Sequence, residues 1–287
     1  MLVRLLLLFL TVATPLTAQI DPDWTTNHAP FRILGNLYYV GSNDLAAYLI
    51  TTPQGNILIN ANLASSVPQL RKNIEALGFR LADTKILLNS QAHFDHSAGT
   101  AELKRLTHAR LEIMDADVSV IESGGRDDFF YYNDPSAQFE PVKVDRILHD
   151  GDHVELGTTV LTAHLTAGHT KGCTTWTMQI TDSGRTYNIV ILGGAGANTG
   201  NNLINDPRYP NQAADFVRTF RTLRTLKCDF FLGAHGSYFQ LKEKYPRLQT
   251  NGPNPFLDPK GYEAYVNERE QSFRTELARQ TAAQEHK

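Results

Sequence analysis

Residues 86–100 read "ILLNSQAHFDHSAGT", and this stretch indicates the fold more clearly than any other part of the chain. It begins inside an apolar run at residues 85–89, which is typical of a strand buried on both faces. His93, Asp95 and His96 follow directly, so the strand would deliver two imidazoles and a carboxylate just beyond its end. Because open α/β sheets place their sites at such strand ends, the stretch predicts an α/β fold with a polar site at one sheet edge.

Strands and helices alternate along the rest of the chain. Three short strands are expected between residues 31 and 60, and further strands within residues 109–115, 145–170, 174–180, 187–194 and 229–235. Helices are expected at residues 67–77, 101–106 and 216–223, and a C-terminal helix begins near Pro259. No linker or internal repeat divides this alternation, which indicates two βα halves packed into a single α/β domain.

The first residues do not belong to this domain. Arg4 gives a positive start, residues 5–13 form a short apolar run, and small residues lead to Ala18. The run is too short to span a bilayer, so the pattern predicts a secretory signal peptide over residues 1–18, cleaved after Ala18. The mature domain would cover residues 19–287 and lie in the periplasm without stable membrane insertion. A retained membrane anchor is the alternative.

Composition excludes some classes of partner. The formal net charge is −3 and no run of Lys and Arg occurs, so a nucleic acid is not expected as a partner. The two cysteines, Cys173 and Cys228, cannot form a disulfide framework over a chain of this length. Export would permit one disulfide between them, but both thiols are expected to be free.

Two further histidines follow predicted strands. His169 lies in "TAGHTKG", and His235 ends the apolar run "DFFLGAH". Imidazole nitrogen and carboxylate oxygen are both common ligands of Zn²⁺. Asp95 and His96 are adjacent and could reach one ion, which His235 could complete. His93 and His169 remain for a second ion.

Gln91 precedes His93 by two residues, and its side-chain carbonyl oxygen could provide a third ligand to that second ion. The remaining histidines lack a position at a strand end. They are assigned no role: His28, His108, His149, His153, His164 and His286.

The motif Gln91-x-His93-x-Asp95-His96, with the "GHTKG" and "LGAH" segments, resembles the metallo-β-lactamase superfamily. The resemblance is closest to subclass B3 enzymes of the GOB type, in which Gln stands in the first His position. It covers nearly all of the mature chain and implies an αββα sandwich with a shallow groove that holds one or two Zn²⁺ ions. The first site would consist of Gln91, His93 and His169. The second would consist of Asp95, His96 and His235.

The resemblance also implies a reaction. A zinc-activated hydroxide would attack the β-lactam carbonyl, and the second ion would steady the nitrogen that leaves. Asp95 would be both a ligand and a catalytic residue that orients the attacking water. Because a neutral amide oxygen binds zinc less well than imidazole does, the Gln91 site is expected to be the weaker one. We therefore expect a monomeric zinc enzyme that hydrolyses penicillins, cephalosporins and carbapenems and confers antibiotic resistance.

Some positions depart from related enzymes. Ala195 and Ala197 stand where many relatives carry residues that bind metal or substrate, and neither alanine can do so. Asn60 stands where many relatives carry Asp. The aromatic run "FFYY" could be a buried strand, but its flanking aspartates favour a loop that contacts the drug. The candidate substrate contacts are Phe129, Phe130, Tyr131, Tyr132 and Asn198.

Three other functions are less consistent with the sequence. A lactonase or thioesterase of the same fold usually uses a late bridging Asp, and the chain has alanine and glycines around position 195. A non-catalytic zinc-binding protein would need a further protein ligand, which the sequence does not offer. A serine hydrolase is disfavoured because neither S-x-x-K nor G-x-S-x-G occurs.

Overall fold

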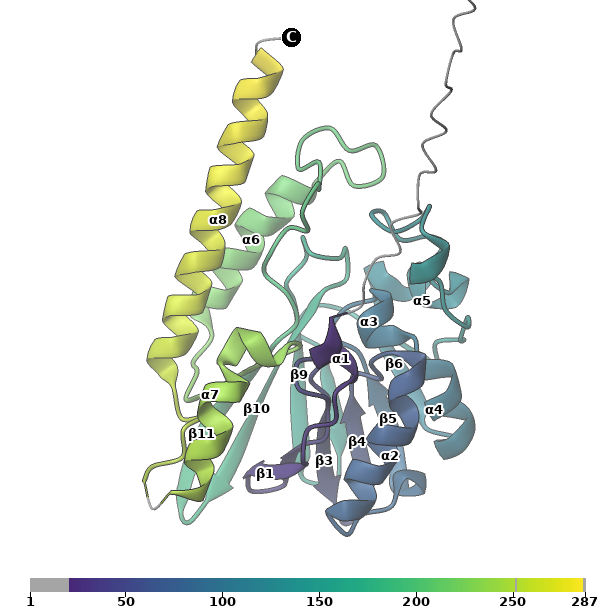
Figure 1. Cartoon of the computed structure of the whole chain (residues 1–287), viewed down its shortest axis with the longest axis vertical. Coiled ribbons are helices and arrows are strands. Elements are labelled where there is room, and N and C mark those ends of the chain that lie inside the picture. Colours follow the sequence, from purple (N-terminus) through teal and green to yellow (C-terminus); the bar gives the residue numbers. More distant parts are fainter. Residues whose placement is uncertain (1–20, 251, 286–287) are drawn as a thin grey trace, which may run out of the picture.

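Two β-sheets lie face to face in the centre of the molecule, and helices cover the outer face of each (Figure 1). The computed structural model describes residues 21–250 and 252–285. One sheet has seven strands in the order β1-β2-β3-β4-β5-β6-β7, and the other has five in the order β12-β11-β10-β9-β8. The α/β class and the αββα sandwich are confirmed. The predicted signal peptide lies outside the described residues.

The seven-stranded sheet comes from the first half of the chain. Its strands are β1 (Phe31–Leu34), β2 (Leu37–Tyr39), β3 (Tyr48–Thr52), β4 (Gly55–Ile59), β5 (Thr84–Leu88), β6 (Arg110–Met114) and β7 (Arg146–Leu148). Neighbours are antiparallel from β1 to β4 and parallel from β4 to β7. The sequence predicted three strands before residue 60, and this was wrong by one. Gly35, at φ +52°, allows a tight turn that divides one predicted strand into β1 and β2.

The five-stranded sheet comes from the second half. Its strands are β8 (His153–Leu156), β9 (Thr159–Leu165), β10 (Thr174–Asp182), β11 (Arg185–Leu192) and β12 (Phe230–Gly233). Only β11 and β12 are parallel neighbours; the other pairs are antiparallel. Two antiparallel steps separate β9 from β11, so β9 runs in the same direction as β11 and β12. These three strands therefore end at the same edge of the sheet.

Helices cover the outer faces of the two sheets (Figure 1). On the seven-stranded sheet lie α2 (Val67–Ala76), α4 (Thr100–Thr107) and α5 (Val118–Ser123), and on the five-stranded sheet lie α6 (Gln212–Thr225) and α8 (Pro259–Glu285). The apolar side of α2 buries Val67, Leu70 and Ile74 in one core cluster. Phe216 and Phe220 of α6 join the larger cluster between the sheets and the second helical layer. The helical spacing in the sequence thus corresponds to burial.

Several short helices were not predicted. They are α1 (Pro22–Thr25), α3 (Phe94–Ser97), α5 (Val118–Ser123), α7 (Leu241–Lys244) and the 3₁₀ turns Ala64–Ser66, Leu81–Asp83, Asp115–Asp117, Pro135–Ala137, Gly236–Phe239 and Tyr245–Gln249. They are one or two turns long, which is too short for a clear apolar periodicity.

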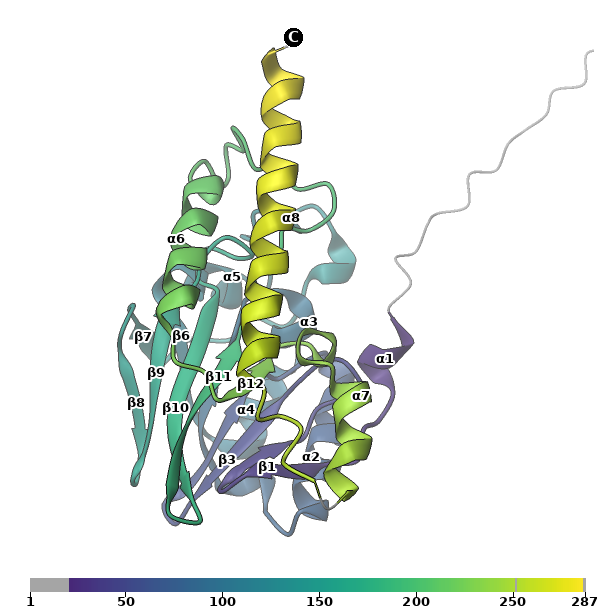
Figure 2. The ribbon, with the colours of Figure 1, turned by 90° about the vertical axis from the view of Figure 1, so that its left-hand side faces the viewer.

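The C-terminal end of α8 projects beyond the rest of the body (Figure 2). The helix buries Tyr262, Val266 and Phe273, whereas residues 281–285 at its end are exposed. Among the described residues, no helix has the length and apolar character needed to cross a membrane.

The two sheets meet at the edge where the candidate site lies. Ala46 of the first half donates from its backbone N–H to the carbonyl of Ala234, just after β12, with an N···O distance of 2.9 Å. Thr174, at the start of β10, donates in the same way to Ser90, just after β5, at 2.8 Å. These backbone bonds join the end of β12 to the segment before β3, and the end of β5 to the start of β10, so each connects one sheet to the other.

Candidate metal centre

Three strand ends deliver the candidate ligands to this edge. His93 follows β5, His169 follows β9 and His235 follows β12. The sequence expected each of these residues at a strand end, and the structure gathers them although they are up to 142 residues apart in the numbering of the chain (235 − 93).

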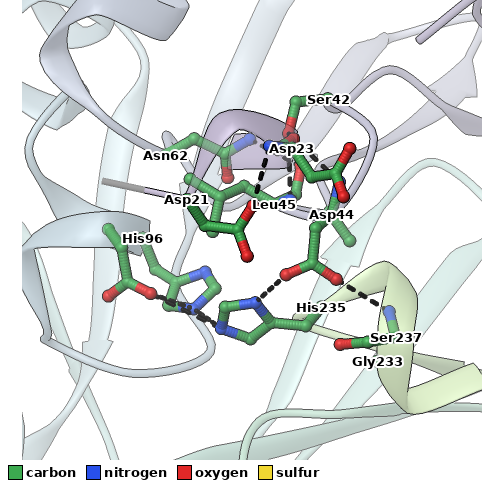
Figure 3. Close-up of polar contacts among 12 residues, drawn as sticks. Asp21, Asp23, Ser42, Asp44, Leu45, Asn62, His96, Gly233, His235 and Ser237 are labelled. Atoms are coloured by element: carbon green, nitrogen blue, oxygen red, sulfur yellow. Dashed lines mark hydrogen bonds and ion pairs between the residues drawn. The ribbon is translucent and has the colours of Figure 1, made fainter. Parts of the chain in front are cut away.

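Asp95, His96 and His235 form a compact buried group that could hold a metal ion. Oδ2 of Asp95 lies 3.3 Å from Nε2 of His96 and 3.4 Å from Nε2 of His235. The two imidazole nitrogens are 3.1 Å apart. Figure 3 shows the rings of His96 and His235 turned toward each other. Convergence of two imidazoles and one carboxylate is the ligand chemistry that suits zinc.

Asp95 and His96 lie on the one-turn helix α3, which the sequence did not predict. The helix starts at Phe94, and His93 is the residue before it. Gly99 follows α3 and is required there, because a Cβ atom would lie 2.5 Å from the carbonyl oxygen of Ala61. This close approach presses α3 against the segment after β4.

A second group contains Gln91, His93 and His169. The ring centroids of His93 and His169 are 4.7 Å apart. Nδ1 of His169 is 2.7 Å from the carbonyl oxygen of Gly196, so Nδ1 donates and Nε2 is left as the ligating nitrogen. Gly194 packs against the same ring, since a Cβ there would lie 2.9 Å from it.

Only one of the two polar atoms of the Gln91 side-chain amide has a hydrogen-bond partner among the described residues. Its Nε2 donates to the carbonyl of Gly193 at 3.3 Å, and the side chain is 2% exposed. Within residues 21–250 and 252–285, its buried Oε1 has no hydrogen-bond partner, and neither has Nε2 of His93. Leaving such atoms unpaired in a protein interior costs about 1–3 kcal/mol each. A cation between them would remove this cost, so the group fits a metal ion.

Charge differs between the two groups. Burial lowers the pKa of His93 to about 4 and the pKa of His169 to about 3, so both imidazoles are neutral at pH 7. Neutral imidazole is the form that binds metals. Burial also acts to lower the pKa of His235, but hydrogen bonds from the ring to Asp44 and Asp95 outweigh it and raise that pKa to about 9.

Asp44 contacts Nδ1 of His235, the ring nitrogen that does not face Asp95. Figure 3 shows the carboxylate of Asp44 directed at this ring. Its Oδ2 accepts a hydrogen bond from Nδ1 of His235 at 2.8 Å, and its Oδ1 accepts one from the backbone N–H of Ser237 at 2.8 Å. Burial raises the pKa of Asp44, but the contact with His235 more than compensates and lowers the pKa to about 2. Nδ1 of His235 is therefore hydrogen-bonded to Asp44, and Nε2 of the same ring points at Asp95 and His96.

Asp117 connects the segments that carry the second group. Its carboxylate accepts hydrogen bonds from the backbone of Ala92 at 3.0 Å, the hydroxyl of Thr170 at 2.7 Å and the backbone of Gly172 at 2.7 Å. Burial raises the pKa of Asp117 to about 6. Buried Asp128 lies nearby, with Oδ2 3.5 Å from Nε2 of His93. The sequence analysis assigned no role to Asp44, Asp117 or Asp128.

Asn60 supports the strand end from behind. It has a left-handed backbone at φ +67°, which Asn tolerates better than most residues. Its Oδ1 accepts from the backbone of Ser90 at 2.9 Å, and its Nδ2 donates to the carbonyl of Ala46 at 3.1 Å. Asn60 therefore links β4, β5 and the segment before β3 beside the site.

The aromatic run at residues 129–132 forms a series of turns. The sequence favoured a loop over a buried strand here, and the turns agree with the loop. Tyr131 stands over the site, with its ring centroid 5.0 Å from that of His93. Phe129 is buried against Tyr209 at 4.9 Å, whereas Phe130 and Tyr132 are partly exposed.

The loop after β11 borders the second group. Ala195 is fully buried, and Asn198 is partly exposed. Cys173 is buried, with Sγ 3.5 Å from the carbonyl oxygen of Gly194. Both Cys173 and Cys228 are free, as expected. His164, which was assigned no role, lies within β9 and contacts Thr177 at 2.8 Å.

Comparisons with known proteins agree with this geometry. The model of the family described as "Metallo-beta-lactamase superfamily" matches residues 45–182. The FEZ-1 metallo-β-lactamase from Legionella gormanii is 52% identical, with a TM-score of 0.88 over 89% of this chain and 98% of that one. GOB-18 from Elizabethkingia meningoseptica is 36% identical, with a TM-score of 0.88 over 92% and 97%.

A third similar structure is the class B3 di-zinc metallo-β-lactamase LRA-12 from an Alaskan soil metagenome. It is 38% identical, with a TM-score of 0.85 over 92% of this chain and 99% of that one. All three are covered almost completely, so the similarity extends over the whole fold and not only over the metal-binding motif. The overall identity to FEZ-1 exceeds that to GOB-18, although Gln91 is the feature that resembles the GOB type.

Proposed function

The chain belongs to the metallo-β-lactamase superfamily, with subclass B3 enzymes among its solved relatives, and on this premise we propose that it hydrolyses β-lactams in a zinc-dependent reaction. Penicillins, cephalosporins and carbapenems are the proposed substrates. The observation that carries this proposal is the gathering of two buried, ligand-rich groups at one edge of the sandwich.

Two zinc sites are proposed. One consists of Asp95, His96 and His235, and the other of Gln91, His93 and His169. The short distances within the first group and the unpaired Oε1 of Gln91 in the second support this division. The first group contains a carboxylate and the second does not, so the first is proposed to bind zinc more tightly. One or two ions per chain would then be bound, depending on the zinc concentration.

Zinc supplies Lewis acidity to such a site, because it lowers the pKa of a bound water to about 7 and polarises a carbonyl oxygen. The residues of this chain would hold the reacting groups in place. Asp95 is the proposed catalytic residue, since its carboxylate can accept a hydrogen bond from the attacking water and fix its direction. Asp44 accepts a hydrogen bond from Nδ1 of His235 at 2.8 Å, which keeps Nε2 of this ring directed at Asp95.

Substrate contacts are proposed along the rim. Tyr131 packs beside His93 and, with Phe130 and Tyr132, offers partly exposed aromatic surface to the apolar substituents of a drug. Phe129 is buried, so it would contribute to substrate binding by supporting the loop that carries the other aromatic residues. Asn198 is the proposed polar contact on the opposite side.

The proposed setting is the periplasm, where β-lactams act, and the consequence is antibiotic resistance. Its support is the signal-peptide pattern of residues 1–18, which precedes the described part of the chain. Cleavage after Ala18 would release a monomer of residues 19–287. The N-terminal mass of protein purified from periplasmic extract tests both the cleavage and the export.

Activity tests the function directly. Purified mature protein should open nitrocefin and imipenem, and EDTA should abolish both activities, with recovery on addition of zinc. Undiminished turnover in EDTA would contradict zinc dependence. Turnover of lactones or thioesters alone would instead favour the alternative function, a lactonase or thioesterase of this fold.

A further inference from the structure

A cleft of about 360 Å³ separates the loop after β11 from the middle of α8. Residues 196–200 form one wall. The facing wall belongs to α8, with Phe273 at its apolar part and the guanidinium groups of Arg269 and Arg279 at its polar part. The α8 wall also carries Glu276, which is paired with Arg279, so Arg269 is the cation of this cleft whose charge is not matched by another residue of the lining.

Arg269 connects this cleft to both groups of candidate ligands. A Cβ atom on Gly196 would lie 3.8 Å from Nη1 of Arg269, and the carbonyl of Gly196 holds His169. On the other side, the guanidinium lies 5.6 Å from the ring centroid of Tyr265. Tyr265 is 5.1 Å from Tyr238, whose ring is in turn 5.0 Å from that of His235. Gly196 therefore lies between Arg269 and His169. Tyr265 and Tyr238 lie between Arg269 and His235.

The guanidinium retains donors for a ligand. Nε and Nη2 of Arg269 pair with Glu268, whose side chain is 54% exposed, so solvent screens that pair. Nη1, the nitrogen nearest Gly196, makes no hydrogen bond within residues 21–250 and 252–285. An Arg fork with free N–H groups suits a carboxylate, which it can bind with two parallel hydrogen bonds.

The proposed substrates present such a group, because penicillins, cephalosporins and carbapenems carry a carboxylate beside the ring nitrogen. The loop offers neutral polar groups at Asn198 and Thr199 but no positive charge, and Ala195 and Ala197 have no polar side chain. Two further cations near the site lie over aromatic rings. Lys171 is 5.8 Å from the ring centroid of Tyr209, and its charge acts on Asp128. Arg208 is 3.3 Å from the ring centroid of Tyr132. Arg279 is paired with Glu276 one turn before it on α8.

We propose that Arg269 is a substrate-binding residue whose guanidinium recognises the carboxylate of the β-lactam at the mouth of this cleft. The inference rests on the proposed β-lactamase function and assigns a specificity element to the C-terminal helix.

The test compares benzylpenicillin with its methyl ester, which lacks the charge, in wild type and in Arg269→Gln and Arg269→Ala variants. A hydrogen bond to a charged group contributes enough that loss of Arg269 should lower kcat/KM for the acid by about tenfold or more, mainly through KM. The kcat/KM for the ester should change little, so the preference for the acid should collapse. Zinc content and Tm should match wild type in at least one of the two variants.

Arg274→Ala is the matched control. It removes the same charge from the same helix, but Arg274 is 59% exposed, pairs with Glu270 and does not line the cleft. It should leave both substrates unaffected. Equal losses for acid and ester in the Arg269 variants would indicate a structural role and overturn the proposal. So would an acid-specific loss in Lys171→Ala with none in the Arg269 variants. A wild type that opens neither substrate would refute the proposed function itself.

Discussion

Gln91 differs from the other candidate ligands because its donor atom would be a neutral amide oxygen. Imidazole binds zinc better, so Gln91→His should strengthen the weaker site. We expect its dissociation constant to fall by about tenfold or more, since even changes in the partners of ligands alter zinc affinity by about 10–100-fold. Zinc titration of the two proteins with metal analysis measures this. Asn60→Ala is the control, because Asn60 bonds to the backbone of Ser90 and Ala46 beside the site and is not a proposed ligand.

Two outcomes of the zinc titration would contradict this prediction. If wild type bound two ions with equal affinity, the amide would not be a weak ligand. If Gln91→His left the weaker affinity unchanged, the unpaired Oε1 of Gln91 would need another partner. The effect on turnover is separate from the effect on affinity, because the carbonyl of Gly193, which now accepts from Nε2, would face an imidazole.

At the residue scale, the sequence alone identified some of the candidate site residues and missed others. Strand ends and zinc-ligand chemistry were sufficient to select His93, His169 and His235, which the structure brings together. Asp44 carries no such signal. It lies 191 residues from His235, and only the pairing of Leu45 with His235 across the sheets makes the contact possible. Buried partners of ligands are set by tertiary structure, so no local pattern reveals them.

At the scale of elements, α8 fixes the loop that borders the site. The side chain of Gln280 forms two hydrogen bonds with the loop backbone: Nε2 donates to the carbonyl of Asn201 at 2.7 Å, and Oε1 accepts from the N–H of Leu203 at 2.8 Å. Gln280→Ala would release both. We expect KM for β-lactams to rise several-fold, since each lost bond costs about 0.5–1.5 kcal/mol of loop order, whereas zinc content should not change.

Gln271→Ala serves as its control, because Gln271 is exposed on the same helix and bonds only to Thr275 one turn later. Steady-state kinetics with zinc analysis separates the two variants. Unaltered KM in Gln280→Ala would mean that the loop keeps its place without the helix. A loss of zinc would mean that the helix supports the metal centre and not the substrate side.

The same scale shows why some elements escaped prediction. The strands β4, β5, β11 and β12 were evident because they are continuous apolar runs, as strands buried on both faces require. The β1–β2 hairpin was missed because its two-residue connection, Gly35 and Asn36, lies inside an otherwise uniform strand pattern. The one-turn helix α3 depends on the backbone of Ala61, which approaches Gly99, and this contact has no trace in the local sequence.

For the whole molecule, the candidate ligands join the two halves of the sandwich. Gln91, His93 and the residues of α3 come from the half that contains the seven-stranded sheet, whereas His169 and His235 come from the half that contains the five-stranded sheet. Each proposed zinc site therefore takes ligands from both halves. An ion that binds only the folded chain stabilises it by about 4 kcal/mol when its concentration is about 1,000 times Kd.

Removal of zinc should consequently destabilise the entire domain and not only its edge. For a chain of this size, about 4 kcal/mol corresponds to a fall in Tm of about 8–16 °C. Scanning calorimetry with added zinc and with EDTA measures the difference. His235→Ala should reduce the zinc-dependent shift, because the tighter site loses a ligand, while His153→Ala, at an exposed position on β8, should leave it intact. Equal Tm values with zinc and with EDTA would show that the two halves hold together without the metal, and the proposed sharing of ligands between them would then contribute nothing to folding.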